Sequence, residues 1–274
     1  RNALILAAAA LAFANVNSIQ AADWGATPTY DPTFKPAYPI GYEQPSPLTF
    51  EAGLRYSYSW GSQSFVYVPN GNTYSAKDNA HSIEAHLRID DRSTSTYLKG
   101  HIGFGGVAEG SFETNGTETS TYKIGRVTFG TADFGYTPLD TETARIGVFG
   151  GYQYTHEAPL NNAIDIHSLR LGVSGRVEVA KAFDINAEAA IIPYSFVSGT
   201  MSNPGGPAAI TNLGGSLYGG SGEVMIGFHP TDMFTVRGGV RGTYLNGTLT
   251  SAQAGQQNVE TFRWGPVFEL TSRF

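Results

Sequence analysis

The last sixteen residues, 259–274, alternate between apolar and polar side chains with a period of two. Counting back from the C-terminus, the apolar positions include Leu270, Phe268, Trp264 and Phe262. The positions between them include Glu269 and Arg263. A period of two is that of a β-strand. Because similar alternation recurs along the chain, with charged side chains on the polar face, it favours a membrane barrel with a polar interior over a soluble sandwich.

The composition agrees with this reading and excludes other classes. Charged residues make up 15% of the chain, against roughly 25% in soluble domains. Mean hydropathy is −0.17, and beyond residue 21 no apolar run is long enough for a membrane helix. The net charge of −6 and the lack of a basic patch argue against a nucleic-acid partner. With no cysteine, stability must come from the strand ladder and not from disulfides.

Three regions are expected along the chain. Residues 1–21 combine Arg1, an apolar stretch and small residues before Ala21, which is typical of a secretory signal peptide. A transmembrane anchor is the less favoured alternative, because the apolar run is short. Residues 22–47 contain six prolines and no periodicity, which predicts an extended periplasmic leader segment. Residues 48–274 are predicted to form the barrel.

Ten segments of residues 48–274 carry the alternation. They lie at about 48–60, 79–90, 98–104, 123–136, 144–154, 168–179, 183–191, 221–228, 234–244 and 259–274. Long polar connections, such as 61–78, 106–122 and 197–216, alternate with short turns. Outer-membrane barrels have long external loops, short periplasmic turns and an even number of strands. We therefore predict an all-β, ten-stranded antiparallel transmembrane barrel with both termini periplasmic.

Two prolines and one segment do not fit this pattern well. Pro193, near the end of a predicted strand, would mark where the sheet leaves the membrane, because proline cannot donate to the ladder. Pro266 lies within the closing strand, where either a bulge or a solvated amide is expected. Segment 123–136 is the least regular, since Val127 and Phe129 share a face with Asp133.

The polar face of the predicted strands is rich in charges of both signs. We expect a lumen charge network of Glu51, Arg55, Glu84, His86, Arg88, Lys99, His101, Arg145, Arg170, Arg176, Glu178, Glu188, Glu223, Arg237, Arg241, Arg263 and Glu269, with Asp133 and Asp184 also facing inward. A barrel of about eight strands is filled by its own side chains, whereas open channels need around sixteen. The charges are therefore expected to pair with one another. An ion pathway is the less favoured alternative.

The strand number and the segment ARIGVFGGYQY (144–154) resemble the omptin proteases. That family cleaves peptides at the extracellular rim with an Asp pair facing an Asp–His pair. The corresponding segments here do not match: the one after the third predicted strand has Glu113 and Glu118 but no Asp, and the one after the seventh has neither Asp nor His. The nearest substitutes are Asp165 and His167, with Asp78 and His81 as a second pair. We therefore predict no enzyme activity, with a surface protease as an unfavoured alternative.

A broader resemblance is to small outer-membrane barrels of alphaproteobacteria, loosely omptin-like or opacity-like. It is carried by the Pro-rich leader, TADFGYTPL (131–139), HSLRLGVSGRVEV (167–179), IPYSFVSG (192–199) and the closing strand. In such barrels a terminal Phe commonly acts as an assembly signal, which here implies Phe268, Leu270 and Phe274. The resemblance implies the bacterial outer membrane as location, with membrane lipid and the barrel assembly machinery as partners.

No motif for a nucleophile elbow, a zinc site or a phosphate loop is present in the sequence. His86 and His101 are expected to be interior hydrogen-bonding residues, so we predict no metal and no cofactor. The favoured function is structural or surface-interacting, with a filled lumen and an unknown surface ligand. The alternative is a small pore for ions or little solutes.

Overall fold

The computed structural model describes residues 47–68, 71–141, 143–159, 163–202, 209–251 and 255–274, in which all helix or strand elements are strands. These are β1 (Leu48–Tyr67), β2 (Thr73–Asp91), β3 (Thr96–Thr114), β4 (Thr117–Tyr122), β5 (Gly125–Asp140), β6 (Ala144–Pro159), β7 (Ala163–Ala180), β8 (Phe183–Ser202), β9 (Ala209–Phe228), β10 (Phe234–Ser251) and β11 (Gly255–Arg273). The predicted signal peptide and nearly all of the predicted leader lie outside the described residues. In the described ranges no helix could serve as a membrane-spanning segment.

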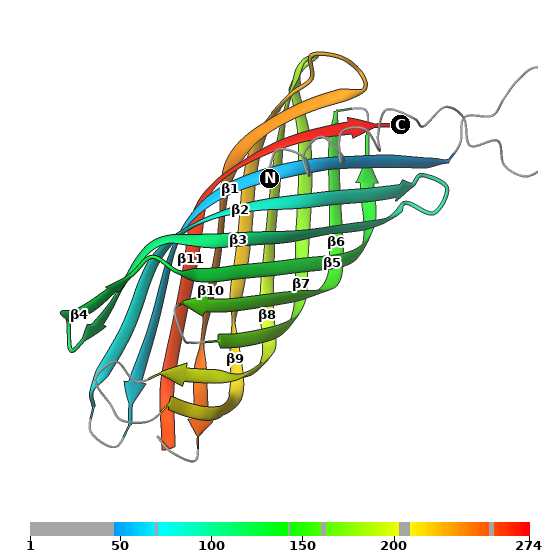
Figure 1. The fold of residues 1–274 in the computed structure, drawn as a ribbon. Coiled ribbons are helices and arrows are strands. Elements are labelled where there is room, and N and C mark those ends of the chain that lie inside the picture. The colour runs from blue at the N-terminus through cyan, green and yellow to red at the C-terminus, as the bar shows by residue number, and fades with distance from the viewer. Residues whose placement is uncertain (1–46, 69–70, 142, 160–162, 203–208, 252–254) are drawn as a thin grey trace, which may run out of the picture. The chain divides into compact units, whose positions relative to one another are not determined.

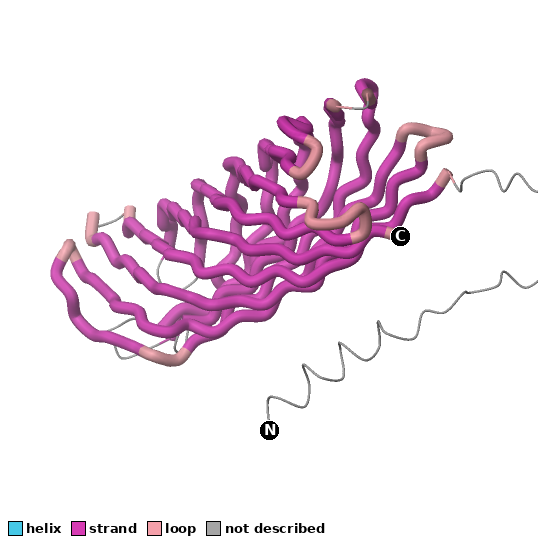
Figure 2. The backbone as a smooth tube through the Cα atoms, turned by 90° about the horizontal axis from the view of Figure 1, so that it is seen from above, coloured by secondary structure: helices cyan, strands magenta, loops and turns pink. Residues whose placement is uncertain are grey.

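All strands except β4 form a closed antiparallel barrel (Figure 1). Each of these ten strands pairs with the next one along the chain, except that β3 pairs with β5, and β11 pairs with β1 to complete the ring. Figure 2 shows the strands side by side and joined by loops. β1 begins and β11 ends at the same end of the barrel, where Phe50 and Phe274 exchange backbone hydrogen bonds of 2.9 and 3.0 Å. We name this the inner end and the opposite one the outer end. The predicted ten-stranded antiparallel barrel is confirmed.

The barrel strands are longer than the alternation predicted. They run for 16 to 20 residues, whereas about 9–11 suffice to cross a bilayer. Much of the predicted polar loops 61–78, 106–122 and 197–216 is therefore strand, and β4 is an additional short strand. These predictions were wrong because a strand that leaves the bilayer can be polar on its outer face, so polarity does not mark where it ends.

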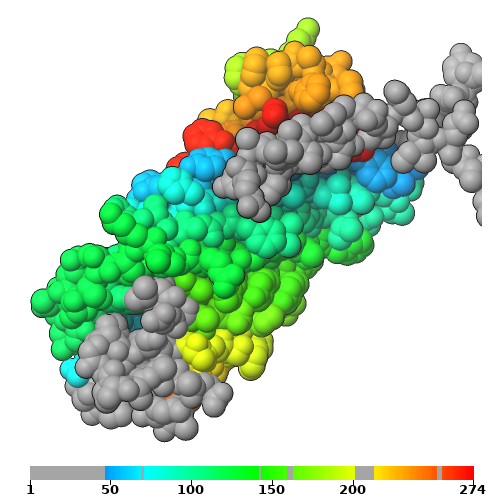
Figure 3. Space-filling model, in the orientation of Figure 1, coloured from blue at the N-terminus to red at the C-terminus, as the bar shows by residue number. Residues whose placement is uncertain are grey.

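The barrel is apolar outside and charged inside. The side chains of Leu54 and Leu171 are 46% and 45% exposed, whereas their chain neighbours Arg55 and Arg170 are 5% and 4% exposed. In the space-filling view the strands form one continuous surface on the face shown (Figure 3). A soluble protein would place these residues the other way round, so the outer surface is suited to hydrocarbon.

On the apolar outside of the barrel wall, aromatic side chains gather towards both the inner and the outer end. Towards the outer end, Trp60 of β1 and Trp264 of β11 pack with ring centroids 4.7 Å apart. At the inner end, Phe183 and Phe228 pack at 5.2 Å, and Phe50 stacks on Phe274. Two aromatic belts of this kind are typical of the two membrane–water interfaces of transmembrane barrels.

The two prolines are accommodated differently. Pro193 lies within β8, and the register shifts next to it in the pairing with both β7 and β9, so it sits in a bulge and the strand continues beyond it. Pro266 pairs with Val240 in an unbroken ladder to β10. On its other side, β1 has no partners for Tyr58 and Ser59, but the register is the same on both sides of this gap. Of the two alternatives expected at Pro266, a bulge or a solvated amide, the bulge is therefore absent from the pairing.

Some glycines make room inside the barrel for large neighbours. A Cβ added to Gly151 would lie 2.0 Å from Oδ1 of Asp133, and one added to Gly135 would lie 2.2 Å from the ring of Tyr97. Strands with small residues at these points let long side chains of the next strand lie across them. Part of the glycine content of the chain therefore serves to make room for large side chains in the lumen.

Candidate functional site

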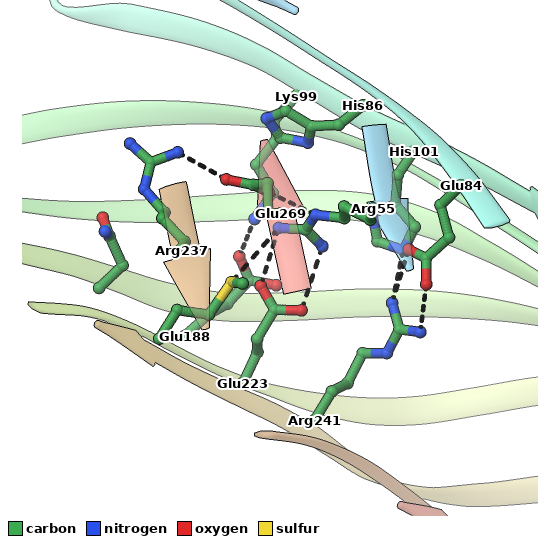
Figure 4. A network of polar contacts seen from close by, with 12 residues as sticks. Arg55, Glu84, His86, Lys99, His101, Glu188, Glu223, Arg237, Arg241 and Glu269 are labelled. Atoms are coloured by element: carbon green, nitrogen blue, oxygen red, sulfur yellow. Dashed lines mark hydrogen bonds and ion pairs between the residues drawn. The ribbon is translucent and has the colours of Figure 1, made fainter. Parts of the chain in front are cut away.

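The centre of the lumen is a network of ion pairs (Figure 4). Arg55 of β1 donates from Nε to Glu269 of β11 at 2.5 Å and from Nη2 to Glu223 of β9 at 3.0 Å. Arg237 of β10 donates to Glu269 at 2.6 Å and to Glu51 of β1 at 2.7 Å. Glu269 therefore accepts from two guanidinium groups, and its side chain is only 1% exposed.

Other pairs of the network reach across the lumen between strands that are not neighbours. Arg241 of β10 donates to Glu84 of β2 at 2.7 Å. Glu188 of β8 receives hydrogen bonds from Lys99 of β3 and from Arg170 of β7, the latter at 2.7 Å. Contacts between β2 and β10 and between β3 and β8 therefore connect distant walls of the barrel across the lumen.

A second layer lies towards the outer end. Arg263 of β11 contacts Asp78 of β2 at 2.9 Å and Glu157 of β6 at 2.8 Å, and Gln63 of β1 also donates to Glu157. Arg263 was predicted to face inward. Asp78, Glu157 and Gln63 were missed as members of the lumen because they lie in segments predicted to be loops. A period of two carried on past residue 60 would have identified Gln63.

The inner end has a looser group of charges. Asp184 lies 2.8 Å from Arg176 and 2.5 Å from His229 Nε2. Arg88 and Arg145 pair with acids close in sequence, Asp90 and Asp140. These two arginines lie at the inner end and do not join the central network.

The seventeen predicted network residues divide accordingly. Glu51, Arg55, Glu84, His86, Lys99, His101, Arg170, Glu188, Glu223, Arg237, Arg241 and Glu269 lie in the central network, Arg263 in the outer layer, and Arg88, Arg145 and Arg176 at the inner end. The exception is Glu178, whose side chain is 47% exposed and lies 3.9 Å from Arg176. Its place in the network was a wrong prediction, because β7 is leaving the enclosed part of the barrel at that point.

The outer part of the lumen also contains an apolar region. It is a cluster of buried side chains from six strands: Phe65, Ile164, Ile166, Ile192, Val197, Leu213, Leu217, Leu245, Leu249 and Val259. This cluster was not predicted, because all of its residues except Val259 lie outside the ten predicted segments. Such a cluster resembles the core of a soluble protein.

Two small cavities remain in the lumen. One of about 100 Å³ lies between the central network and the outer layer and is lined by Ser57, Phe129 and Arg263, among others. The other, of about 90 Å³, faces the inner end. Lys99, Glu188 and Glu223 line both cavities, so the network separates them. Each is large enough for several water molecules.

The two Asp–His pairs that could have served a protease do not lie together. Asp165 and His167 point to the outer surface, where Asp165 accepts from Tyr154 at 2.6 Å and His167 Nδ1 lies 2.5 Å from the Tyr152 hydroxyl. Asp78 faces the lumen, whereas His81 contacts an outer tyrosine. The structure thus brings neither pair to a shared cleft. Among the described residues no group of His, Asp or Glu forms a metal site.

Comparison with known proteins places the fold but not the family. No family model and no curated protein matches the chain. The outer membrane protease OmpT from Escherichia coli is similar in structure, with 12% sequence identity and a TM-score of 0.63 over 82% of this chain and 97% of that chain. The toluene transporter TodX from P. putida matches at 7% identity and a TM-score of 0.30, over 83% and 90% of the two chains. The likeness to OmpT shows that the fold is that of an outer-membrane barrel.

Proposed function

We propose that this protein is a bacterial outer-membrane barrel whose lumen is closed and whose outer end contacts other molecules at the cell surface. The apolar outer surface and the two aromatic belts support residence in a membrane. The inner end, where the turn of residues 181–182 joins β7 to β8, is then periplasmic. On this proposal the protein is not an enzyme, and the charged lumen stabilises the barrel.

Two features inside the lumen support its being closed. Cross-lumen ion pairs of Arg241 with Glu84 and of Lys99 with Glu188 lie at the centre, and the apolar cluster lies beyond them. A small pore is the second candidate, supported by the two cavities on either side of the network. For ions to pass, both the charged pairs and the apolar cluster would have to move.

Planar-bilayer recording of the purified protein tests this proposal. We expect no steady conductance, because the cross-lumen ion pairs and the apolar cluster lie in the path of an ion. A reproducible single-channel step that persists after further purification would instead establish the pore. Heat-modifiable migration of the same preparation on a gel controls for folding. We also expect this preparation to leave a mixed peptide substrate intact. Cleavage that is lost in His167→Ala would instead favour the protease hypothesis.

A further inference from the structure

A hairpin of the barrel projects beyond the wall at the outer end. β3 pairs with β5 only as far as Gly106, and beyond this point its other neighbour is β4 (Figure 1). Register shifts occur between Asn79 and Ala80 in the pairing of β2 with β3 and between Phe112 and Glu113 in that of β3 with β4. Bulges increase the local bend and twist of strands. They therefore curve the hairpin relative to the wall.

This curvature leaves a concave site, which we name the hairpin groove. It is a cavity of about 550 Å³ between the hairpin and the strands β1, β2 and β11. Trp60, Phe262 and Trp264 form its aromatic side, and each is about two-fifths exposed. Its volume lies in the range of small-molecule sites, about 300–1,000 Å³. The lumen cavities are several times smaller.

The polar side of the hairpin groove is partly preorganised. Lys77 donates to Glu113 at 2.7 Å, and Asn79 donates to Glu109 at 3.1 Å, so two cross-strand pairs hold the wall formed by β2 and β3. These pairs link β2 to β3 at the edge of the groove.

The opposite wall offers unused hydrogen-bonding groups. Three residues line the groove from β4 and the position after it: Glu118, Thr121 and Lys123. None of their side chains has a polar partner among the described residues. They provide a carboxylate, a hydroxyl and an ammonium group across from the indole rings. A ligand that fits must present an apolar face to the aromatics and several polar groups to this wall.

We propose that the hairpin groove binds a sugar ring without a phosphate. Sugar rings have a face of C–H groups that packs on aromatic rings, and a rim of hydroxyls that both donate and accept hydrogen bonds. Glu109 and Glu118 face the same groove as Lys77 and Lys123, so the site has no excess positive charge to favour a phosphate. This inference rests on the proposed surface role and names the chemistry of the ligand.

Tryptophan fluorescence provides the test. The chain has three tryptophans, and Trp24→Phe leaves only Trp60 and Trp264 as reporters, both in the groove. The protein is held in an amine-oxide detergent, which has no sugar headgroup. Octyl and methyl glycosides of glucose, galactose and mannose are then titrated below micelle formation. We expect a saturable change in fluorescence with at least one ring configuration.

Matched variants locate the binding. Glu118→Gln with Lys123→Met should weaken it about tenfold or more through lost hydrogen bonds to charged groups. Glu260→Gln with Lys181→Met, at exposed positions outside the groove, should bind as the parent does.

The outcomes separate the possible sources of the sugar. Equal binding of octyl and methyl glycosides supports a free sugar, and binding of octyl glycosides alone supports a sugar carried by a lipid. No response to any glycoside, the same response to an octyl chain without sugar, or unchanged binding by the Glu118/Lys123 variant overturns the proposal. A conducting lumen would contradict the closed barrel but would not alter this titration, so the two failures are distinguishable.

Discussion

Replacing Glu269 with alanine should lower the free energy of unfolding by about 3–5 kcal/mol, which is the usual cost of removing one partner of a buried ion pair. The carboxylate is almost fully buried and accepts hydrogen bonds from both Arg55 and Arg237. Without it, two guanidinium groups stay in the lumen with fewer acceptors. Unfolding by guanidinium chloride of protein refolded into lipid vesicles, followed by tryptophan fluorescence, gives the free energy.

Glu178→Ala is the matched control for this measurement. It removes the same side chain from an exposed position that lies 3.9 Å from Arg176, so its effect should stay within about 0.5 kcal/mol. If Glu269→Ala were as stable as Glu178→Ala, the lumen network would not hold the barrel together. Glu269→Gln should fall between them, because it keeps the shape and one acceptor but loses the charge.

Changing Phe274 to alanine should sharply reduce the amount of folded barrel in the outer membrane of cells. We propose that the closing strand, with Phe268, Leu270 and Phe274 on its exposed side, is read by the barrel assembly machinery. In the folded protein the ring of Phe274 contributes mainly its stack on Phe50, at 6.1 Å. An aromatic pair of this kind is worth about 1 kcal/mol, so refolded protein should be only slightly less stable.

Phe50→Ala separates the two roles of Phe274. It removes the same stack but leaves the C-terminal residues unchanged. On the proposed assembly role, Phe50→Ala reaches the membrane normally while Phe274→Ala does not, although both lose a similar amount of stability after refolding. Equal yields of the two variants in membranes would mean that the aromatic contact matters and the terminal residue is not a signal.

The fold could be predicted from the sequence because each residue of a strand inside a bilayer faces either lipid or the lumen, and its polarity indicates which. Leu54 beside Arg55 and Leu171 beside Arg170 can be satisfied in only one way when one face meets hydrocarbon and the other is enclosed. Even the irregular segment 123–136 is explained by this rule, since Val127 and Asp133 are both buried inside the barrel.

The outer part of the molecule could not be predicted in the same way. Outside the bilayer both faces of a strand can be polar, so β4 (Thr117–Tyr122) had the composition of a loop. The apolar residues of the outer lumen, such as Leu213 and Leu249, lie in glycine- and threonine-rich stretches where alternation is weak. The hairpin groove depends on bulges in β3 and β4, and the position of a bulge is set by pairing and not by composition.

The central claim, that alternate residues face lipid and an enclosed lumen, is tested most directly by spin labels along β7. The chain has no cysteine, so single cysteines can carry a nitroxide at one position at a time. In lipid vesicles, labels at Leu169, Leu171 and Val173 should be readily accessible to dissolved oxygen, and labels at Ser168 and Ser174 should not. Oxygen accessibility that is uniform along the strand, or highest at the serines, would contradict the account.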